Sequence, residues 1–324
     1  MTNSNLKVRG LLSWVAGCVV ISCLTACSGS SQRSLLSYVP SSSYAVLIVN
    51  WKSVRKDPDL KRICKGEEIE KLFSQLDLAE ESVTELAVYG SLGASAQAAN
   101  GLIAKGSFDS SEIVKKLGKM GWVEQDLDGR RVYVNSKDAA WLTTFSKNLF
   151  VLGTESAVRD AIGAKAKSEN RFTSSPAYKA MASHFDDKQY PIVMMVALPK
   201  GSQDLVNAAV QLSSTVMDLA GVGPLGDLLN KIGYARGLGC GISHTGESFP
   251  VALSAVMKDE ESARLVSGAL NLLKSFGEIA SNSYGSGTND DATRAIRAMS
   301  IERSREVISI KMAMSRRDLG TMNR

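Results

Sequence analysis

The sequence predicts an α+β protein of two similar halves, each a mainly antiparallel sheet with helices packed on one face. Two apolar runs, Tyr44–Trp51 and Tyr190–Ala197, each open a succession of strand, helix, strand, strand, helix and hairpin. Apolar runs of this length are typical of strands buried on both faces. We therefore expect a first α+β repeat over residues 37–165, a linker over 166–189 and a second repeat over 190–324.

In the first half, capping and turn residues set the expected elements. Asp57 before Pro58 pairs an N-cap with a first-turn proline, and Asp109 opens a second amphipathic run. Asp128-Gly129 is the signal of a type I′ hairpin. Strands are expected at 85–91, 101–107, 141–145 and 149–152, with a hairpin over 122–135, a helix after Asp57, another after Asp109 and a third from 154.

The second half predicts a matching order of elements. Helices are expected at 202–220 and 224–231, then strands at 234–243 and 249–257, a helix from 259 and a hairpin over 296–314. One face of the strand that starts at Tyr234 is nearly bare, because alternate positions are Ala235, Gly237, Gly239, Gly241 and Ser243. A bare face permits close approach of a helix, a ligand or another backbone, and we favour a closely packed helix.

Composition supports a folded chain with a sizeable core. Hydrophobic residues make up 44% and charged residues 22% of the 324 residues, which excludes wholesale disorder. We expect the core to include Val46, Ile48, Leu72, Val88, Ile103, Leu117, Val151, Ile192, Met194, Leu238, Val251, Leu270 and Ile308.

The N-terminus has the pattern of an export signal. The first ten residues contain Lys7 and Arg9 and no acid, and the mostly apolar run Leu11–Cys23 follows. That run is shorter than the ~20 residues a membrane-spanning helix needs, so a signal peptide over residues 1–26 is the better interpretation.

The signal ends in Leu24-Thr25-Ala26-Cys27, which resembles the lipobox of bacterial lipoproteins. The resemblance implies cleavage after Ala26, a diacylglyceryl group on the Cys27 thiol and an acyl chain on its amine. Residues 27–36 would then be the lipidated cysteine and a flexible tether. Ser28 stands where an inner-membrane retention signal usually has Asp, which favours the outer membrane, facing the periplasm, in a diderm cell. The alternative is an ordinary secretory signal with a coincidental cysteine.

Charge and cysteine usage exclude some classes of partner. The formal charge is +5, and about +3 remains once Lys7 and Arg9 leave with the signal, too little to indicate nucleic-acid binding. Cys64 and Cys240 remain in a compartment that permits disulfides, so they are either a bond between the halves or two small buried side chains. With two histidines in the chain, we expect no metal centre and no cofactor.

The motifs that could carry catalysis lack their required context. The pattern Gly221-x-Gly223-x-x-Gly226 follows a helical run rather than a strand, unlike a dinucleotide fingerprint. A serine nucleophile needs an oriented base, and the two histidines, His184 and His244, lie in polar segments typical of the surface. We therefore expect that the protein is not an enzyme. The alternative is a cell-wall hydrolase, which an activity screen on peptidoglycan would test.

These observations favour a non-enzymatic envelope lipoprotein that presents an α+β surface for protein interaction or scaffolding. Its expected partners are the membrane, through lipid on Cys27, and envelope proteins. The alternative is a carrier or sensor that binds a lipid or other apolar molecule between the halves, compatible with the Tyr190 strand and the glycine face. Tyr38-Val39-Pro40 and the segment 152–158 are similar to a broad group of uncharacterised exported bacterial proteins, which supplies no catalytic residue.

Overall fold

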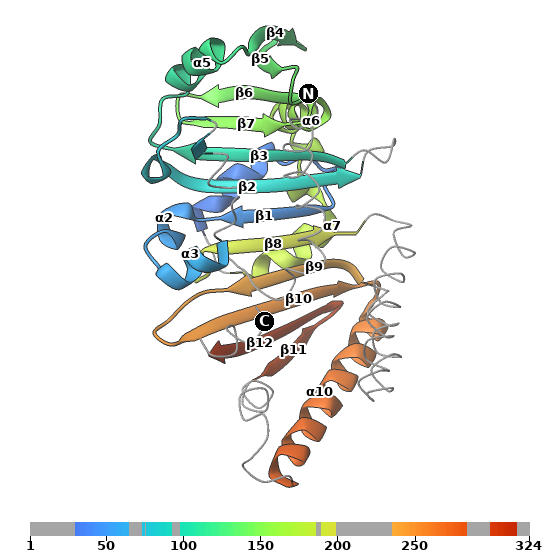
Figure 1. Ribbon diagram of the computed structural model, residues 1–324. Helices are drawn as coiled ribbons and strands as arrows, with labels where there is room; N and C mark the ends of the chain where they lie inside the picture. Colours follow the sequence, from blue (N-terminus) through green and yellow to red (C-terminus); the bar gives the residue numbers. More distant parts are fainter. Residues whose placement is uncertain are drawn as a thin grey trace. The chain divides into compact units, whose positions relative to one another are not determined.

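The chain folds into two compact units of α+β structure (Figure 1). The first unit comprises Met1–Ser175 and Asp186–Met194, and the second comprises Pro176–Phe185 and Met195–Arg324. The computed structural model describes residues 30–64, 73–74, 76–92, 98–185, 189–198, 235–283 and 299–315. Antiparallel strands with helices packed against them form both units, which confirms the predicted α+β class.

In the first unit the sheet has the order β1-β2-β3-β7-β6-β5-β4, and each neighbouring pair is antiparallel. The strands are β1 (Ala45–Val49), β2 (Val83–Leu92), β3 (Ala98–Gly106), β4 (Val123–Leu127), β5 (Arg130–Asn135), β6 (Ala140–Ser146) and β7 (Leu149–Gly153). The helices are η2 (Ser30–Tyr38), α2 (Trp51–Val54), α3 (Pro58–Cys64), η3 (Glu80–Ser82), α5 (Ser110–Lys119), α6 (Glu155–Ala166), η4 (Ser168–Asn170) and η5 (Phe172–Ser174).

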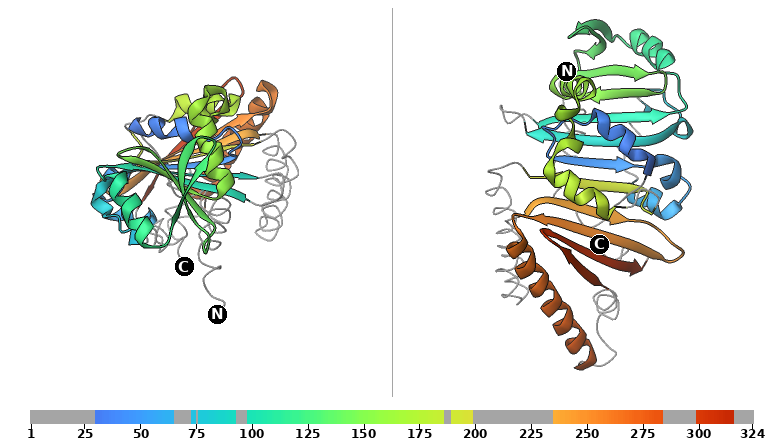
Figure 2. Two further views of the ribbon diagram at one scale, coloured as in Figure 1. Left: turned by 90° about the horizontal axis from the view of Figure 1, so that it is seen from above. Right: turned by 180° about the vertical axis from the view of Figure 1, so that it is seen from behind.

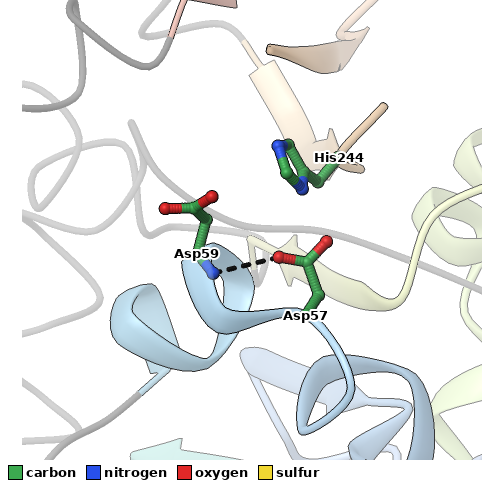
Figure 3. A group of neighbouring side chains, drawn as sticks. All are labelled: Asp57, Asp59 and His244. Atoms are coloured by element: carbon green, nitrogen blue, oxygen red, sulfur yellow. Dashed lines mark hydrogen bonds between the residues drawn. The ribbon is translucent and has the colours of Figure 1, made fainter. Parts of the chain in front are cut away.

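Side-chain caps start the helices of the first unit where the sequence predicts them. The Asp57 carboxylate accepts a hydrogen bond from the backbone N–H of Asp59 at 3.0 Å (Figure 3). It also accepts one from the backbone N–H of Leu60 at 3.1 Å. Asp109 accepts from the backbone of Ser111 at 2.8 Å and opens α5 in the same way. Each cap satisfies an N–H group that has no partner inside the helix.

The predicted type I′ turn joins β4 to β5. Asp128 and Gly129 have φ angles of +55° and +78°, the two positive values that this turn requires. The hairpin over residues 122–135 is therefore confirmed, with β4 on the outer edge of the first unit's sheet.

In the second unit the sheet contains the order β9-β10-β12-β11, again antiparallel. Its strands are β9 (Ala235–Ile242), β10 (Ser248–Met257), β11 (Ser300–Ser304) and β12 (Val307–Ser315), and its helices are α7 (Pro176–Met181), η6 (Ala182–His184) and α10 (Glu260–Ser283). The division between the units falls within β8 (Ile192–Ala197), after Met194. The predicted helices at 202–220 and 224–231 lie outside the described residues.

Both units repeat one order of strands. A hairpin (β2–β3 or β9–β10) leads into a helix (α5 or α10), and the chain returns by a second hairpin (β6–β7 or β11–β12). In each case the last strand pairs with the second strand of the first hairpin, β7 with β3 and β12 with β10. The counterpart of β11–β12 is therefore β6–β7, and the β4–β5 hairpin has no counterpart among the described residues of the second unit.

Most of the predicted core is buried. Val46, Ile48, Ile103, Leu117, Val151, Ile192, Met194, Val251 and Ile308 are buried, whereas Val88, Leu238 and Leu270 are half-buried and Leu72 lies outside the described residues. The strand β8 is buried along nearly its whole length, as the apolar run around it predicts. The core thus follows the predicted strand alternation.

Two segments expected to be flexible connections are instead packed. Leu35 and Leu36, at the end of the range 27–36 expected as a tether, are 0% and 1% exposed. Phe172 and Met181 are both 0% exposed, although they fall in the range 166–189 expected as a linker. Both segments are polar in overall composition, but each contains a few large apolar side chains that are buried in the core of a unit.

The nearly bare face of β9 is covered by the helical segment at its side, as predicted. A Cβ atom at Gly237 would lie 2.9 Å from the Ala177 Cβ of α7, and one at Gly239 would lie 2.5 Å from the Phe185 ring. Side chains larger than hydrogen would therefore force these groups away from the strand. Among the described helices, none is both long and apolar enough to span a bilayer.

Candidate functional site

The predicted site residues are distributed between the described and undescribed parts of the chain. Cys27 and the Gly221–Gly226 pattern lie outside the described residues. Cys64 ends α3 in the first unit and is half-buried, whereas Cys240 is buried in β9 of the second unit. Burial raises the pKa of the Cys64 thiol to about 12. The Cys64–Cys240 disulfide stays a prediction, because the two residues belong to different units.

The first described element after the expected anchor is η2, which packs on β2 and on α6. In Figure 2, α6 lies across one face of the first unit's sheet. Glu85 of β2 is 6% exposed, and its carboxylate pairs with the Lys105 Nζ of β3 at 3.0 Å. Lys105 also donates to the Ser34 Oγ of η2 at 3.2 Å. The buried charge of Glu85 is thus compensated beside η2, as a carboxylate in a low-dielectric setting requires.

Aromatic rings and cations surround the end of η2. The Tyr38 ring meets the Phe145 ring edge-on, with centroids 4.7 Å apart. The Arg130 guanidinium carbon lies 4.0 Å from the centre of the Phe145 ring, and the Lys165 Nζ lies 4.7 Å from that of Tyr38. Both contacts have the geometry of cation–π interactions. Burial lowers the pKa of Arg130, because water is partly withdrawn from its charge.

A further cation, Arg171, forms hydrogen bonds with the backbone beside η2. Its Nε donates to the Ala164 carbonyl at 2.9 Å and its Nη2 donates to the Lys165 carbonyl at 3.3 Å, and both carbonyls lie at the end of α6. The backbone of Arg171 forms an antiparallel bridge with Pro40. We define the η2 face as Ser34, Tyr38, Lys105, Arg130, Lys165 and Arg171.

The second unit contains a histidine–serine contact that the sequence does not indicate. The His184 Nδ1 of η6 lies 2.8 Å from the Ser309 Oγ of β12, 125 residues away in sequence. Burial is the main cause that lowers the pKa of His184, Lys311 lowers it further and Glu302 opposes the shift. His184 is half-buried rather than a surface residue as expected.

The position of Ser309 decides what this contact can do. A serine nucleophile needs a neighbouring base and access to substrate, and Ser309 is only 4% exposed. It lies opposite Ser254 of β10, which is also 4% exposed. The contact is therefore a hydrogen bond between the imidazole of His184 and a buried hydroxyl group, and Ser309 is not open to a substrate.

The remaining sequence candidates serve local structure. Asp57 is engaged as the cap of α3. His244, expected in a turn, follows β9, is half-buried and stacks on the Phe249 ring with centroids 4.5 Å apart.

Comparison with known proteins identifies only distant structural neighbours. No protein-family model matches the chain, and no curated protein matches it. Crystal form III of TP0453 aligns with a TM-score of 0.44 at 11% identity, over 88% of this chain and 96% of that one. Crystal form I of TP0453 gives 0.42 at 12% identity, over 89% and 95% of the two chains. A likeness at this level supports no conclusion about activity.

Proposed function

We propose that the chain is a lipid-anchored protein of the bacterial cell envelope whose two units serve protein interaction or scaffolding without catalysis. The observation that carries the proposal is the N-terminal order of basic residues, the apolar run Leu11–Cys23 and Leu24–Cys27, which resembles a lipoprotein signal. Each buried methylene of an acyl chain contributes ~0.8 kcal/mol. Several long chains on Cys27 would therefore hold the protein at the membrane for its lifetime.

The described structure is compatible with such an anchor. The first described element, η2, begins at Ser30, and Leu35 is buried in the core of the first unit. An extended chain spans at most ~3.5 Å per residue, so the three steps from Cys27 to Ser30 reach at most ~10 Å. A protein anchored at Cys27 would hold its first unit close to the membrane surface.

Two structural observations favour interaction over the alternative functions. The His184–Ser309 contact is closed to substrate, because Ser309 is 4% exposed. The glycine face of β9, which was compatible with an apolar ligand, is instead filled by side chains of α7 and by Phe185. Catalysis at this histidine and ligand binding at this glycine face therefore each lose their support.

The anchor is tested with the full-length chain in a bacterial host. We expect the wild type in the membrane fraction, with an intact mass that corresponds to residues 27–324 plus the lipid groups. Cys27→Ser should abolish both results, whereas Cys23→Ser, four residues earlier in the same segment, should preserve them. A soluble wild-type protein with unmodified Cys27 would overturn the proposal.

The interaction function is tested by crosslinking the full-length protein in its own envelope. We expect a recurrent crosslinked partner that reappears when the crosslinker length is changed and is lost after unfolding. Native mass spectrometry of the chain from Ser28 to Arg324 tests the carrier alternative. A reproducible small-molecule adduct without any crosslinked protein would replace scaffolding by transport or sensing.

A further inference from the structure

We propose that the η2 face of the first unit lies on the anionic headgroups of the membrane that holds Cys27, an inference that rests on the lipid anchor proposed above. The partner is thus a lipid surface, recognised through clustered cations and an amphipathic ring.

The reach of the chain places η2 near the headgroups. Residues 28 and 29 separate Cys27 from Ser30, where η2 begins. A 3₁₀-helix rises ~2.0 Å per residue, so Leu35, which is 0% exposed, lies within ~20 Å of the lipidated residue even if the chain is fully stretched. The polar layer of a bilayer leaflet is ~5–8 Å thick. The residues packed beside η2 are therefore held within reach of that layer.

The η2 face combines groups that suit a membrane interface. Lys165 is exposed, whereas Lys105, Arg130 and Arg171 are half-buried, and their charged groups contact Glu85, the Thr144 carbonyl and the Ala164 carbonyl of the same unit. A long, exposed basic side chain such as Lys165 can keep its charge in the polar layer of a membrane interface. Tyr38, half-buried between Phe145 and Lys165, has the apolar ring and polar hydroxyl that favour the headgroup level.

The charge of this face remains positive after its acidic neighbours are counted. Glu85 is buried and paired with Lys105, and Asp160 of α6 accepts a hydrogen bond from Ser42 at 3.2 Å. The four cations of the face thus exceed these two acids. Each cation near an anionic leaflet contributes about a fivefold gain in binding.

The first test uses the lipidated full-length protein in vesicles, where the anchor holds it regardless of lipid charge. One set of vesicles contains phosphatidylethanolamine and phosphatidylglycerol, and the other only phosphatidylcholine. Brief acetylation should modify Lys105 and Lys165 several-fold more slowly on the anionic vesicles. Lys119, exposed at the end of α5, is the matched control and should react equally on both. Equal protection of Lys119 and Lys165 would overturn the proposed orientation.

The second test separates this face from the anchor. The chain from Ser28 to Arg324 contains every described residue and lacks the lipidated cysteine. It should sediment with the anionic vesicles, weakly and less at high salt, and not with phosphatidylcholine. Lys165→Gln should lower that partition about fivefold and Lys119→Gln should not change it. The Lys165 ammonium group contacts only the Tyr38 ring in the described structure, so the variant should keep its fold.

The two proposals fail in different ways. An unmodified Cys27 would remove the anchor, yet the chain from Ser28 would still report whether the η2 face prefers anionic lipid. If Cys27 is lipidated but the chain from Ser28 sediments equally with both kinds of vesicle, the proposed contact between the η2 face and anionic lipid is wrong. The same conclusion follows if Lys165→Gln has no effect. In both cases the anchor proposal still holds.

Discussion

The two units place an aromatic ring against a glycine of the sheet in opposite ways. In the first unit the ring comes from the sheet: Tyr89 of β2 lies over Gly101 of β3 and donates to the Ala157 carbonyl of α6 at 2.9 Å. In the second unit the ring comes from the segment after α7 and η6, where Phe185 lies on Gly239 and Gly241. In both, a Cβ atom on the glycine would overlap the ring, so the absence of a side chain permits the close contact.

This difference affects how strongly each unit depends on residues outside its sheet. The first unit needs α6 as an acceptor for a phenol that is 1% exposed, because a buried hydroxyl without a partner is costly. The second unit needs the residues around α7 to cover a strand that has few side chains of its own on one face. The segment expected as a linker is therefore part of the core of both units.

The largest expected effects come from truncating that segment. Phe172→Ala should lower the free energy of unfolding of the first unit by ~3–5 kcal/mol, and Met181→Ala that of the second by ~2–5 kcal/mol, because both side chains are 0% exposed. Hydrogen exchange of peptides from β3 and β9 reports each unit separately. If the segment were only a linker, hydrogen exchange of the β3 and β9 peptides would be the same in both variants as in the wild type.

A smaller effect is expected from adding a methyl group at the glycines. Gly101→Ala would place its Cβ 2.2 Å from the Tyr89 ring, and Gly239→Ala would place its Cβ 2.5 Å from the Phe185 ring. Each should destabilise its own unit by ~1–3 kcal/mol through overpacking. Urea unfolding of each variant, followed by the same exchange peptides, measures the effect.

The chain supplies matched controls for these substitutions. Gly163 in α6 and Gly268 in α10 have open space where a Cβ would lie. Replacement of either by Ala should stabilise its helix by ~0.5–1 kcal/mol. In a Phe185→Ala background, Gly239→Ala should cost clearly less, because the ring that it displaces is gone. Equal costs in both backgrounds would show that Phe185 is not the contact that excludes a side chain.

The sequence predicts those parts of the fold that depend on neighbours a few residues away. The Asp57 and Asp109 caps and the Asp128-Gly129 turn each need groups within three residues, and the structure confirms all three. The apolar alternation likewise identifies most of the core. The packing of Phe172 and Met181 is not predicted, because one large side chain in a polar segment gives no periodic signal.

The candidate sites also differ in whether their residues are close together in the sequence. The lipobox is contiguous, so the sequence alone suggests it. The η2 face draws Ser34, Lys105 and Lys165 from separate elements, and only the packing of η2 on the sheet brings them together. The same holds for the His184–Ser309 contact, whose members are 125 residues apart. Neither set has a sequence signal that could have been found.

Acid should distinguish the two units. Both histidines of the chain, His184 and His244, belong to the second unit. Burial lowers the pKa of folded His184, so the unfolded chain binds more protons as the pH falls through its unfolded pKa of ~6.5. The second unit should therefore lose stability between about pH 7 and pH 5, while the first has no histidine to contribute such a loss.

The measurement is urea unfolding at a series of pH values, with exchange peptides from each unit. His184→Gln, which keeps a hydrogen-bonding group near Ser309, should flatten the pH dependence of the second unit. Retention of the full dependence in this variant would assign the effect to other groups.

The smallest expected effect concerns the two remaining thiols, one in each unit. Burial raises the pKa of the Cys64 thiol to about 12, so less of it is ionised at pH 8 and alkylation of the folded protein should be slower than that of an ordinary exposed cysteine. Cys240, 7% exposed in β9, should be protected by lack of access. The same shift predicts that stability falls as the pH rises above the unfolded thiol pKa of ~8.5, because the unfolded chain then releases a proton that the fold retains.

Unfolding without a reductant separates protected thiols from a disulfide. If Cys64 and Cys240 remain thiols, the chain from Ser28 to Arg324 should take up iodoacetamide at both positions once it is unfolded, and intact mass will show two additions. A chain that takes up none until it is reduced would contain the Cys64–Cys240 bond. In that case, Cys64→Ser should expose a reactive Cys240 in the unfolded protein. It should also lower stability by about 2–5 kcal/mol, because a covalent link closes a long loop of the unfolded chain. The thiol form instead predicts a small effect of Cys64→Ser, confined to exchange peptides of the first unit.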